Sequence, residues 1–419
     1  MGRAGRKTIR TQVAIIGSGP AGLFLAHLLH QAKIDAVVLE HRNRDYVEGR
    51  VRAGVLEQTT VDLMDRLGLA SRMRREGLIH EGVNFAYDEE LFRVDLAAGS
   101  GRPGVTVYGQ QEIMKDLFDA AADRGLQIIF DVSDVQICDV TSEQPCVTWR
   151  EAGGERRLDC DVVVGCDGFH GVSRSSIPAS VLRTFERVYP FGWLGVLADV
   201  PPPNRELIYC NHEHGFALAS MRSATRSRCY IQCALDERLE DWSDERFWDE
   251  FTLRLGDRAA GTFKPGPCFE KSIAPLRSFV AEPMRYGNLF LAGDAAHIVP
   301  PTGAKGLNLA VSDVITLAGG LEELFCERST SGVDDYSRSA LSRVWKAERF
   351  SWWFTSLTHR FPGMGPLERR LQKAELDYLH TSSAAQASFA ENYVGLPLEM
   401  DRIRASAPAD HVLMRKGMT

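Results

Sequence analysis

The sequence lacks the features of disulfide-stapled, metal-binding and membrane-spanning chains. Its nine cysteines are odd in number and irregularly spaced, with no CxxC pair, so we expect reduced thiols, no disulfide framework and no metal site. No apolar run reaches the roughly 18 residues of a membrane span. The basic start leads into an apolar stretch that Gly17-Ser18-Gly19-Pro20 interrupts at once, which argues against secretion and predicts a cytoplasmic protein.

An excess of positive charge is also missing. Lys and Arg number 49 against 56 Asp and Glu, a formal net charge of −7, so we expect no nucleic-acid partner, although a local basic site for an anion stays open. Hydrophobic residues (44%) and charged residues (25%) are as frequent as in ordinary globular proteins, which excludes disordered and fibrous classes. At roughly 150 residues per domain, 419 residues predict two or three domains.

The chain does contain alternating buried strands and helices. Residues 12–17, 20–31 and 34–40 form the pattern of strand, helix and strand that is typical of a βαβ unit with a parallel sheet. Residues 187–235 resemble half-exposed antiparallel strands, and residues 335–375 have a helical, aromatic-rich pattern. We therefore expect a mixed α/β fold with a Rossmann-like nucleotide-binding domain, an antiparallel-sheet substrate domain and a helical C-terminal region. The expected boundaries are 11–185, 186–285 and 286–398, with extensions at 1–10 and 399–419.

A glycine-rich turn joins the first strand to the first helix. In GSGPAG, Gly17 permits the tight turn, Gly19 lets a pyrophosphate approach the backbone, and Gly22 lets helix and strand pack closely. The helix N-terminus adds free N–H groups and a positive dipole. Glu40 ends the next strand, where a carboxylate can hold ribose hydroxyls. A purely structural glycine turn is the alternative, but strand, helix and acid together favour a dinucleotide site.

Three further segments favour FAD over NAD as the dinucleotide. One segment carries two arginines, and two strands end in a carboxylate; each alone would fit a solvated loop. The residues concerned are Arg50, Val51, Arg52, Ala53, Gly54 and Val55 in the first segment, Asp167 in CDG, and Asp294 in LAGDAAH. No second GxGxxG follows, so we expect no separate nicotinamide domain.

GxGxxG, an Asp-Gly strand end and GDAAH form a three-part pattern, by which the chain resembles the class A flavoprotein aromatic hydroxylases. The resemblance covers residues 11–398 and rests also on RVRAGVLEQ, CDGFHG, RVYPFGWLG, RSATRSR, HIVPPTGAKGLNLA, WKAERFSWW and AENYVGLP. It implies bound FAD, NADPH and O2 as co-substrates, and a homodimer, with Gln110 as a flavin contact. It also implies hydroxylation of 4-hydroxybenzoate at C3, through a flavin C4a-hydroperoxide, to 3,4-dihydroxybenzoate.

The segment FALASMR predicts a receptor for a carboxylate. Ser220 and Arg222 are two residues apart and so share one face of a strand, where a hydroxyl and a forked guanidinium suit a planar carboxylate. Tyr230 on the next strand can add a donor. A polar sheet face in water is the alternative that these residues alone would favour. The resemblance implies that all three bind substrate, with backbone contacts from Met221 and Pro301.

Attack by an electrophilic oxygen requires an ionised phenol, so the site must remove the phenol proton near neutral pH. A tyrosine hydroxyl suits this task because it both donates and accepts a hydrogen bond. The resemblance implies a proton path through Tyr209, Tyr393 and His80. Taken singly, the two tyrosines would more often be core aromatics, and His80 a surface or capped histidine.

The loop PPTGAKGLN precedes a helix whose positive N-terminus, at Leu307 and Asn308, would stabilise negative charge on a reduced flavin. Pro301 and Thr302 in this loop would lie beside the substrate. A plain surface loop is the alternative.

NADPH is expected to dock in a surface cleft, as the resemblance implies. His41 and Arg42 follow Glu40, where the family has Arg and Gln, so NADH stays open as the alternative electron donor. Arginines after Glu40 can nevertheless pair with the 2′-phosphate of NADPH. The residues expected to contact NADPH are His41, Arg42, Arg44, Tyr46, His170 and Arg277.

Two rival functions stay open. A hydroxylase of another para-substituted benzoate, such as 4-aminobenzoate, would not need a phenol-ionising tyrosine pair. Cys229, where the family usually has an aromatic residue beside Tyr230, is a departure that could alter the pocket wall. A non-catalytic flavin protein that senses an aromatic acid would have no use for a proton path.

Overall fold

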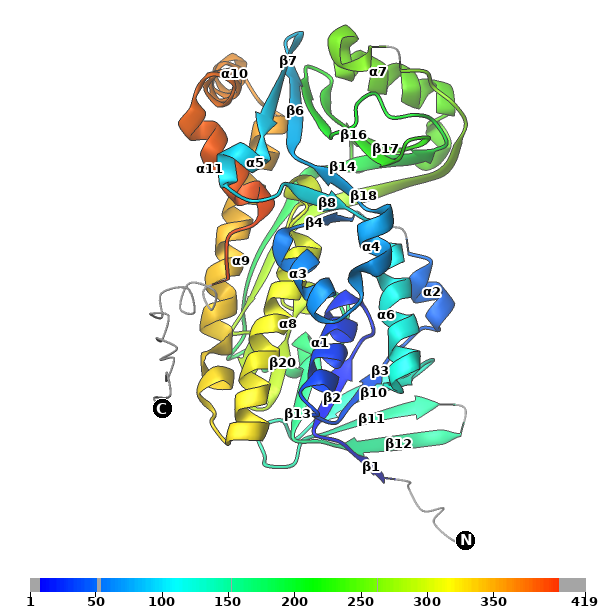
Figure 1. The fold of residues 1–419 in the computed structure, drawn as a ribbon, viewed down its shortest axis with the longest axis vertical. Coiled ribbons are helices and arrows are strands. Elements are labelled where there is room, and N and C mark those ends of the chain that lie inside the picture. Colours follow the sequence, from blue (N-terminus) through cyan, green and yellow to red (C-terminus); the bar gives the residue numbers. More distant parts are fainter. Residues whose placement is uncertain (1–7, 51–53, 152, 262, 399–419) are drawn as a thin grey trace, which may run out of the picture.

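The computed structural model describes residues 8–50, 54–151, 153–261 and 263–398, which form a mixed α/β fold (Figure 1). A six-stranded sheet in the order β19-β20-β13-β2-β3-β9 lies at its centre, and all but β19 run parallel. Because helices cover this sheet, its strands are almost wholly apolar. The strands are β2 (Val13–Ile16), β3 (Ala36–Leu39), β9 (Gln127–Ile129), β13 (Val162–Gly165), β19 (Arg285–Tyr286) and β20 (Leu289–Leu291).

The expected βαβ unit is confirmed. Helix α1 (Pro20–Gln31) joins β2 to β3 and has its proline in the first turn, where the missing N–H costs no intrahelical hydrogen bond. It packs against α6 (Gln110–Arg124) and α8 (Gly306–Glu322). This layer holds the glycine turn at the carboxyl end of the sheet.

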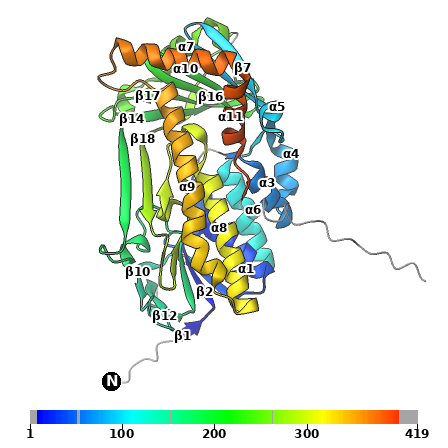
Figure 2. The ribbon, with the colours of Figure 1, turned by 90° about the vertical axis from the view of Figure 1, so that its left-hand side faces the viewer.

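The expected antiparallel sheet is an eight-stranded one in the order β21-β18-β14-β17-β16-β15-β6-β7, with only β15 and β6 parallel. Its two longest strands, β14 and β18, run lengthwise through the molecule and tie this sheet to the central layer (Figure 2). The strands are β6 (Gly82–Tyr87), β7 (Glu90–Asp95), β14 (Arg183–Ala198), β15 (Ile208–His212), β16 (Gly215–Ser223), β17 (Arg226–Cys233), β18 (Cys268–Glu282) and β21 (His297–Ile298).

The two faces of this sheet belong to different cores. One face packs against α9 (Ser331–Thr358), α10 (Pro366–Thr381) and α11 (Ser383–Val394), and the other against α7 (Asp244–Ala260). Alternate residues of a strand therefore enter opposite cores, which decides which side chains can meet a substrate.

Smaller elements complete the fold. A four-stranded sheet contains β1 (Thr8–Arg10), β10 (Ser133–Cys138), β11 (Cys146–Glu151) and β12 (Gly154–Asp159), and a three-stranded sheet contains β4 (Val55–Leu56), β5 (Leu78–His80) and β8 (Val105–Val107). The remaining α-helices are α2 (Arg44–Glu48), α3 (Gln58–Arg66), α4 (Ala70–Glu76) and α5 (Leu96–Ser100). All nine cysteines are free thiols, as expected. Among the helices described, none combines the length and apolarity needed to cross a membrane.

Candidate active site

The three glycines of the first turn differ in their surroundings as their expected roles require. Gly17 has φ +99°, and a Cβ there would lie 2.5 Å from the Cys166 carbonyl oxygen. A Cβ on Gly22 would lie 2.0 Å from the Gly17 oxygen, so helix and turn touch there. Gly19, by contrast, has no atom within 4 Å of the Cβ position, which leaves the backbone at the start of α1 open to a ligand.

Adjacent parallel strands bring the expected acidic residues to this turn. The order β20-β13-β2-β3 places Asp294, Asp167, the glycine turn and Glu40 at one edge of the sheet, where α/β proteins bind nucleotides. Glu40 is buried, and its Oε2 accepts from the Ser18 amide (2.7 Å) and hydroxyl (2.8 Å). Its Oε1 accepts from the Arg42 amide (2.8 Å), so the carboxylate is fixed yet keeps lone pairs for a ribose hydroxyl.

Asp167 has one committed and one uncommitted oxygen. Oδ2 accepts from the Ser173 amide and hydroxyl, each at 2.9 Å, whereas Oδ1 is buried without a partner among the described residues. Burial raises the pKa of this carboxyl above its usual value. An orphaned acceptor at the edge that carries the glycine turn fits a ligand hydroxyl.

The arginine-bearing segment is only partly described. Val51, Arg52 and Ala53 lie outside the described residues, while Arg50 is exposed. A Cβ on Gly54 would lie 1.9 Å from the Tyr108 oxygen, so the segment runs directly against the β8–α6 turn that leads to Gln110.

The expected carboxylate receptor lies on the sheet face that packs against α9 and α11. Ser220 is buried and pairs in register with Arg228. The register shifts between Met221 and Ser223, so a β-bulge places Arg222, a feature that simple alternation does not foresee. The Nη1 of Arg222 is buried without a partner among the described residues, and burial lowers the pKa of the guanidinium. A guanidinium with one buried, unpartnered nitrogen suits an anionic ligand.

Tyr230 shares this face. A Cβ on Gly195 would lie 2.8 Å from its ring, so the glycine leaves room for the tyrosine. The guanidinium of Arg228 lies 5.3 Å from the Tyr230 ring centroid and donates to Glu270 (2.7 Å) and Ser272 (3.1 Å). Sequence reasoning missed Arg228, although its two-residue spacing from Tyr230 was a usable signal.

Cys229 points to the other side of the sheet. It belongs to the core under α7, together with Ala219 and Ile231, and not to the cluster that contains Tyr209 and Tyr230. Its departure from the family pattern therefore leaves the face that carries the carboxylate receptor unchanged.

The two expected tyrosines meet. The hydroxyls of Tyr209 on β15 and Tyr393 on α11 are 2.8 Å apart, and both side chains are fully buried. Burial raises the pKa of both phenols, so both are neutral at pH 7 and can pass a proton without ionising.

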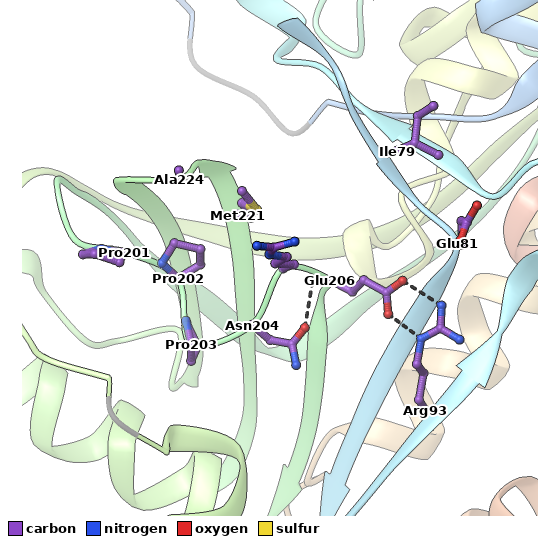
Figure 3. A pocket seen from close by; sticks show the side chains of 11 residues that line it. Ile79, Glu81, Arg93, Pro201, Pro202, Pro203, Asn204, Glu206, Met221 and Ala224 are labelled. Atoms are coloured by element: carbon purple, nitrogen blue, oxygen red, sulfur yellow. Dashed lines mark hydrogen bonds and ion pairs between the residues drawn. The ribbon is translucent and has the colours of Figure 1, made fainter.

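His80 is buried on β5, and neither ring nitrogen has a partner among the described residues. Burial lowers its pKa to about 4, so the imidazole is neutral at pH 7. Its chain neighbours Ile79 and Glu81 line a cleft of about 840 Å³ together with Met221 (Figure 3). In the same cleft Arg93 holds Glu206 through contacts of 2.6 and 2.8 Å.

The loop before α8 is anchored from behind. Thr302 lies in the short 3-10 turn Pro301–Gly303, and its hydroxyl bonds to that of Thr355 on α9 (2.9 Å). The Asn308 side chain accepts from the Glu57 amide (2.9 Å) and the Thr60 hydroxyl (2.7 Å). Since it also donates to the Val55 and Ala304 carbonyls, Asn308 can offer a flavin only its backbone, as can Leu307 beside it.

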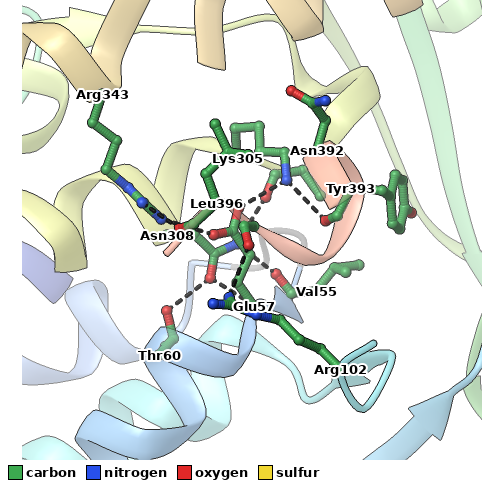
Figure 4. Close-up of polar contacts among 12 residues, drawn as sticks. Val55, Glu57, Thr60, Arg102, Lys305, Asn308, Arg343, Asn392, Tyr393 and Leu396 are labelled. Atoms are coloured by element: carbon green, nitrogen blue, oxygen red, sulfur yellow. Dashed lines mark hydrogen bonds and ion pairs between the residues drawn. The ribbon is translucent and has the colours of Figure 1, made fainter. Parts of the chain in front are cut away.

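A buried ion cluster at this loop was not foreseen (Figure 4). Lys305 donates to Glu57 (2.8 Å) and to the Tyr393 carbonyl (2.8 Å), and Arg343 contacts the other Glu57 oxygen (3.2 Å). Burial lowers the pKa of Lys305. Glu57 and Lys305 are 248 residues apart, and no local pattern pairs them.

The residues expected to contact NADPH form two groups. His170 and Arg277 meet around Phe169, at 5.0 Å and 4.4 Å from its ring, and Arg277 pairs with Glu186 (3.2 Å).

The second group lies near α2. The exposed Arg42 guanidinium lies 4.9 Å from the Tyr46 ring, and His41 Nδ1 lies 3.1 Å from the Val132 carbonyl. Arg44 is held by Glu48 (2.5 Å) and Asp119, which neutralise it, so Arg42 is the better candidate for a phosphate.

Comparisons with known proteins agree with this geometry. Residues 10–351 match the family described as FAD binding domain. The chain is 53% identical over 394 residues to the p-hydroxybenzoate hydroxylase of Acinetobacter baylyi, covering 94% of this chain and 97% of that one. It is 26% identical to a 3-(3-hydroxy-phenyl)propionate/3-hydroxycinnamic acid hydroxylase of Mycolicibacterium gilvum, over 76% of this chain and 54% of that one. The p-nitrophenol 4-monooxygenase structure from Pseudomonas putida matches the fold with a TM-score of 0.79 at 19% identity, over 93% and 99% of the two chains.

Proposed function

The chain belongs to the FAD binding domain family of flavoprotein hydroxylases, and on that premise we propose that it hydroxylates 4-hydroxybenzoate at C3. The products are 3,4-dihydroxybenzoate and water, and the co-substrates are NAD(P)H and O2. One observation carries the choice of substrate. The Arg222 guanidinium, whose buried Nη1 has no partner among the described residues, and a buried tyrosine pair, Tyr209 and Tyr393, serve one sheet face, as a ligand with a carboxylate and a phenol would need.

The chain's residues fit FAD. The open backbone at Gly19 would bind the pyrophosphate, and Glu40 would bind a ribose hydroxyl. Asp167 and Asp294 would bind the neighbouring hydroxyl groups of FAD. The chemistry that FAD supplies when bound is reduction by NAD(P)H and transfer of one oxygen atom from O2 to the ring. The first turn of α8 would place backbone N–H groups near its negatively charged end.

Arg222 orients the substrate. Its guanidinium binds the carboxylate as an ion pair, and the hydroxyls of Ser220 and Tyr230 donate to the same group. Burial makes the Arg222 cation costly without an anion, and its Nη1 has no partner among the described residues, so it would discriminate strongly against an uncharged phenol.

The tyrosine pair removes the phenol proton. Either hydroxyl can donate in the bond between them; when Tyr393 donates, the Tyr209 proton is free to stabilise a phenolate oxygen. The released proton passes along the two hydroxyls toward His80, whose neutral ring can accept at one nitrogen and release at the other. From His80 it reaches solvent at the cleft that Ile79 and Glu81 line.

The rival substrates fit this chemistry less well. An amine such as that of 4-aminobenzoate has no proton to lose near neutral pH, so the Tyr209–Tyr393 pair would have no task. A non-catalytic sensor would likewise leave the pair and His80 without a role. NADPH remains our preferred donor because His170, Arg277 and Arg42 are placed on the surface for an anionic coenzyme, with NADH as the alternative.

We also propose a cytoplasmic homodimer. Helices α9 and α10 expose large apolar side chains, among them Trp352, Leu367 and Leu371, and such patches mark association surfaces.

The test is turnover by the purified yellow protein. NADPH oxidation, with and without 4-hydroxybenzoate, is measured together with 3,4-dihydroxybenzoate and hydrogen peroxide. We expect strong stimulation with nearly one product per NADPH. Stimulation with peroxide but no product would mean that the pocket accepts this acid but that the true substrate is a close analogue. No stimulation with either NADPH or NADH would overturn the proposal.

A further inference from the structure

A buried histidine at the end of α9 has a fixed protonation state. His359 is fully buried, and its Nε2 lies 2.7 Å from the indole nitrogen of Trp193. Because an indole N–H can only donate, Nε2 must be the unprotonated nitrogen. The proton is therefore on Nδ1, which faces the Thr355 carbonyl (3.1 Å) and the Thr358 hydroxyl (3.0 Å).

Aromatic rings enclose this imidazole. Phe216 stacks on it at 4.2 Å and Phe191 at 4.9 Å, while the plane of the Trp193 ring is parallel to that of the imidazole within 4°. Burial lowers the pKa of His359 to about 3, consistent with a neutral acceptor.

The same turn of α9 contacts both walls of the candidate substrate pocket. On the sheet side, Trp193 lies 5.1 Å from the ring of Tyr230, one of the expected carboxylate donors. On the loop side, Thr355, whose carbonyl faces His359, bonds through its hydroxyl to Thr302 (2.9 Å). A rotation of the Trp193 indole would therefore disturb Tyr230.

We propose that His359 is a positioning residue for substrate binding: its unprotonated Nε2 fixes the Trp193 indole, and the indole fixes Tyr230 in the carboxylate site. The inference rests on the proposed function. His359 does not touch the reacting groups, so its loss should act on substrate affinity and leave the chemical step largely intact.

The hydrogen bond and the ring stack can be separated experimentally. His359→Phe keeps an aromatic ring beside Phe216 and Phe191 but leaves the Trp193 N–H without an acceptor. A buried donor without an acceptor costs free energy, so the indole should move. Trp193→Phe removes that donor, so the double variant has no orphaned group. His359→Gln retains an acceptor. His380→Phe is a matched control, because His380 stacks on Phe92 at 4.3 Å outside the pocket.

KM for 4-hydroxybenzoate and kcat are measured for the five variants and the unsubstituted protein, with FAD content as the check on folding. We expect His359→Phe to raise KM about tenfold, which corresponds to about 1.4 kcal/mol. Its kcat should stay within about threefold, a change of under 1 kcal/mol. His359→Gln and His380→Phe should keep KM close to that of the unsubstituted protein. The double variant should match Trp193→Phe, because removing the donor abolishes the effect of removing its acceptor.

Two results would overturn the inference. One is a folded His359→Phe with unchanged KM. The other is a double variant whose KM exceeds that of Trp193→Phe by the full tenfold, which would mean that His359 acts only through stacking. If His359→Phe does not fold, the comparison of the double variant with Trp193→Phe decides. Absence of turnover by the unsubstituted protein would instead overturn the proposed function, which separates the two failures.

Discussion

At the level of single residues, Arg222 is the main candidate for binding the substrate carboxylate. Because the buried Nη1 of its guanidinium has no partner among the described residues, removing Arg222 should remove the main attraction for the substrate carboxylate. We expect Arg222→Ala to weaken 4-hydroxybenzoate binding about 100-fold, or about 3 kcal/mol, without loss of FAD. The matched control is Arg226→Ala on the same hairpin, an exposed arginine paired with Asp199. Substrate titration of flavin fluorescence measures both, and unchanged affinity of Arg222→Ala would remove the carboxylate assignment.

Glu348 gives a prediction about pH. It is buried on α9, and burial raises its pKa to about 7 although Ser278 and His297 oppose the rise. The folded state therefore binds more protons than the unfolded state between pH 4.5 and 7, and its stability falls as the pH rises through that window.

Glu348→Gln cannot lose a proton, so it should gain stability relative to the unsubstituted protein as the pH rises, by up to about 3 kcal/mol. Thermal unfolding at pH 5 and pH 8 measures the difference. Glu391→Gln serves as the control, because Glu391 is exposed. A stability difference for Glu348→Gln that is the same at both pH values would refute the assignment.

Contacts between candidate site residues could be predicted where sequence spacing or family resemblance indicated them. The Tyr209–Tyr393 contact was foreseen in this way and is present. The cluster of Glu57, Lys305 and Arg343 was not, because its members come from distant elements and only the tertiary fold places them together.

At the level of elements, the glycine turn separates a packing role from a binding role. Gly22→Ala would place a methyl group 2.0 Å from a backbone oxygen, so we expect little folded protein. Gly19→Ala meets no atom within 4 Å and should fold, yet the methyl group would occupy the approach of the pyrophosphate. We expect Gly19→Ala to purify with at least tenfold weaker FAD binding, more than about 1 kcal/mol. Full FAD affinity in Gly19→Ala would contradict a pyrophosphate at this turn.

Elements with strong periodicity were predictable from the sequence. The helix expected at 20–31 is α1 (Pro20–Gln31), and the strands around it were also expected. The segment after β4 forms two short helices, α3 and α4, which Gly68 with φ +71° separates. The bulge at Arg222 was not foreseeable, since it depends on pairing with β17.

At the level of the whole molecule, the sequence predicted the layers better than their connection. Both main sheets were expected, but no local pattern indicates the length of the 16-residue strand β14 and the 15-residue strand β18, which extend the eight-stranded sheet along the molecule. The expected boundary at residue 185/186 falls inside β14.

The exposed helical face gives a prediction about assembly. Leu371 on α10 is 61% exposed and lies one turn after the exposed Leu367. If this face joins two copies, Leu371→Glu should shift the protein toward monomer in sedimentation velocity while kcat stays within about twofold, under 0.5 kcal/mol. Leu253→Glu on α7, also exposed, is the control and should not change the mass. A dimer that persists in Leu371→Glu would place the interface elsewhere.

The central claim is that the Tyr209–Tyr393 pair ionises the substrate phenol. The most direct measurement is an absorption titration of protein-bound 4-hydroxybenzoate against pH, because phenol and phenolate absorb differently. We predict that the bound phenol has a lower pKa than the free ligand, and that Tyr209→Phe, which keeps the ring but loses the donor, raises it again. A bound pKa equal to that of the free ligand, or one that Tyr209→Phe leaves unchanged, would contradict the account.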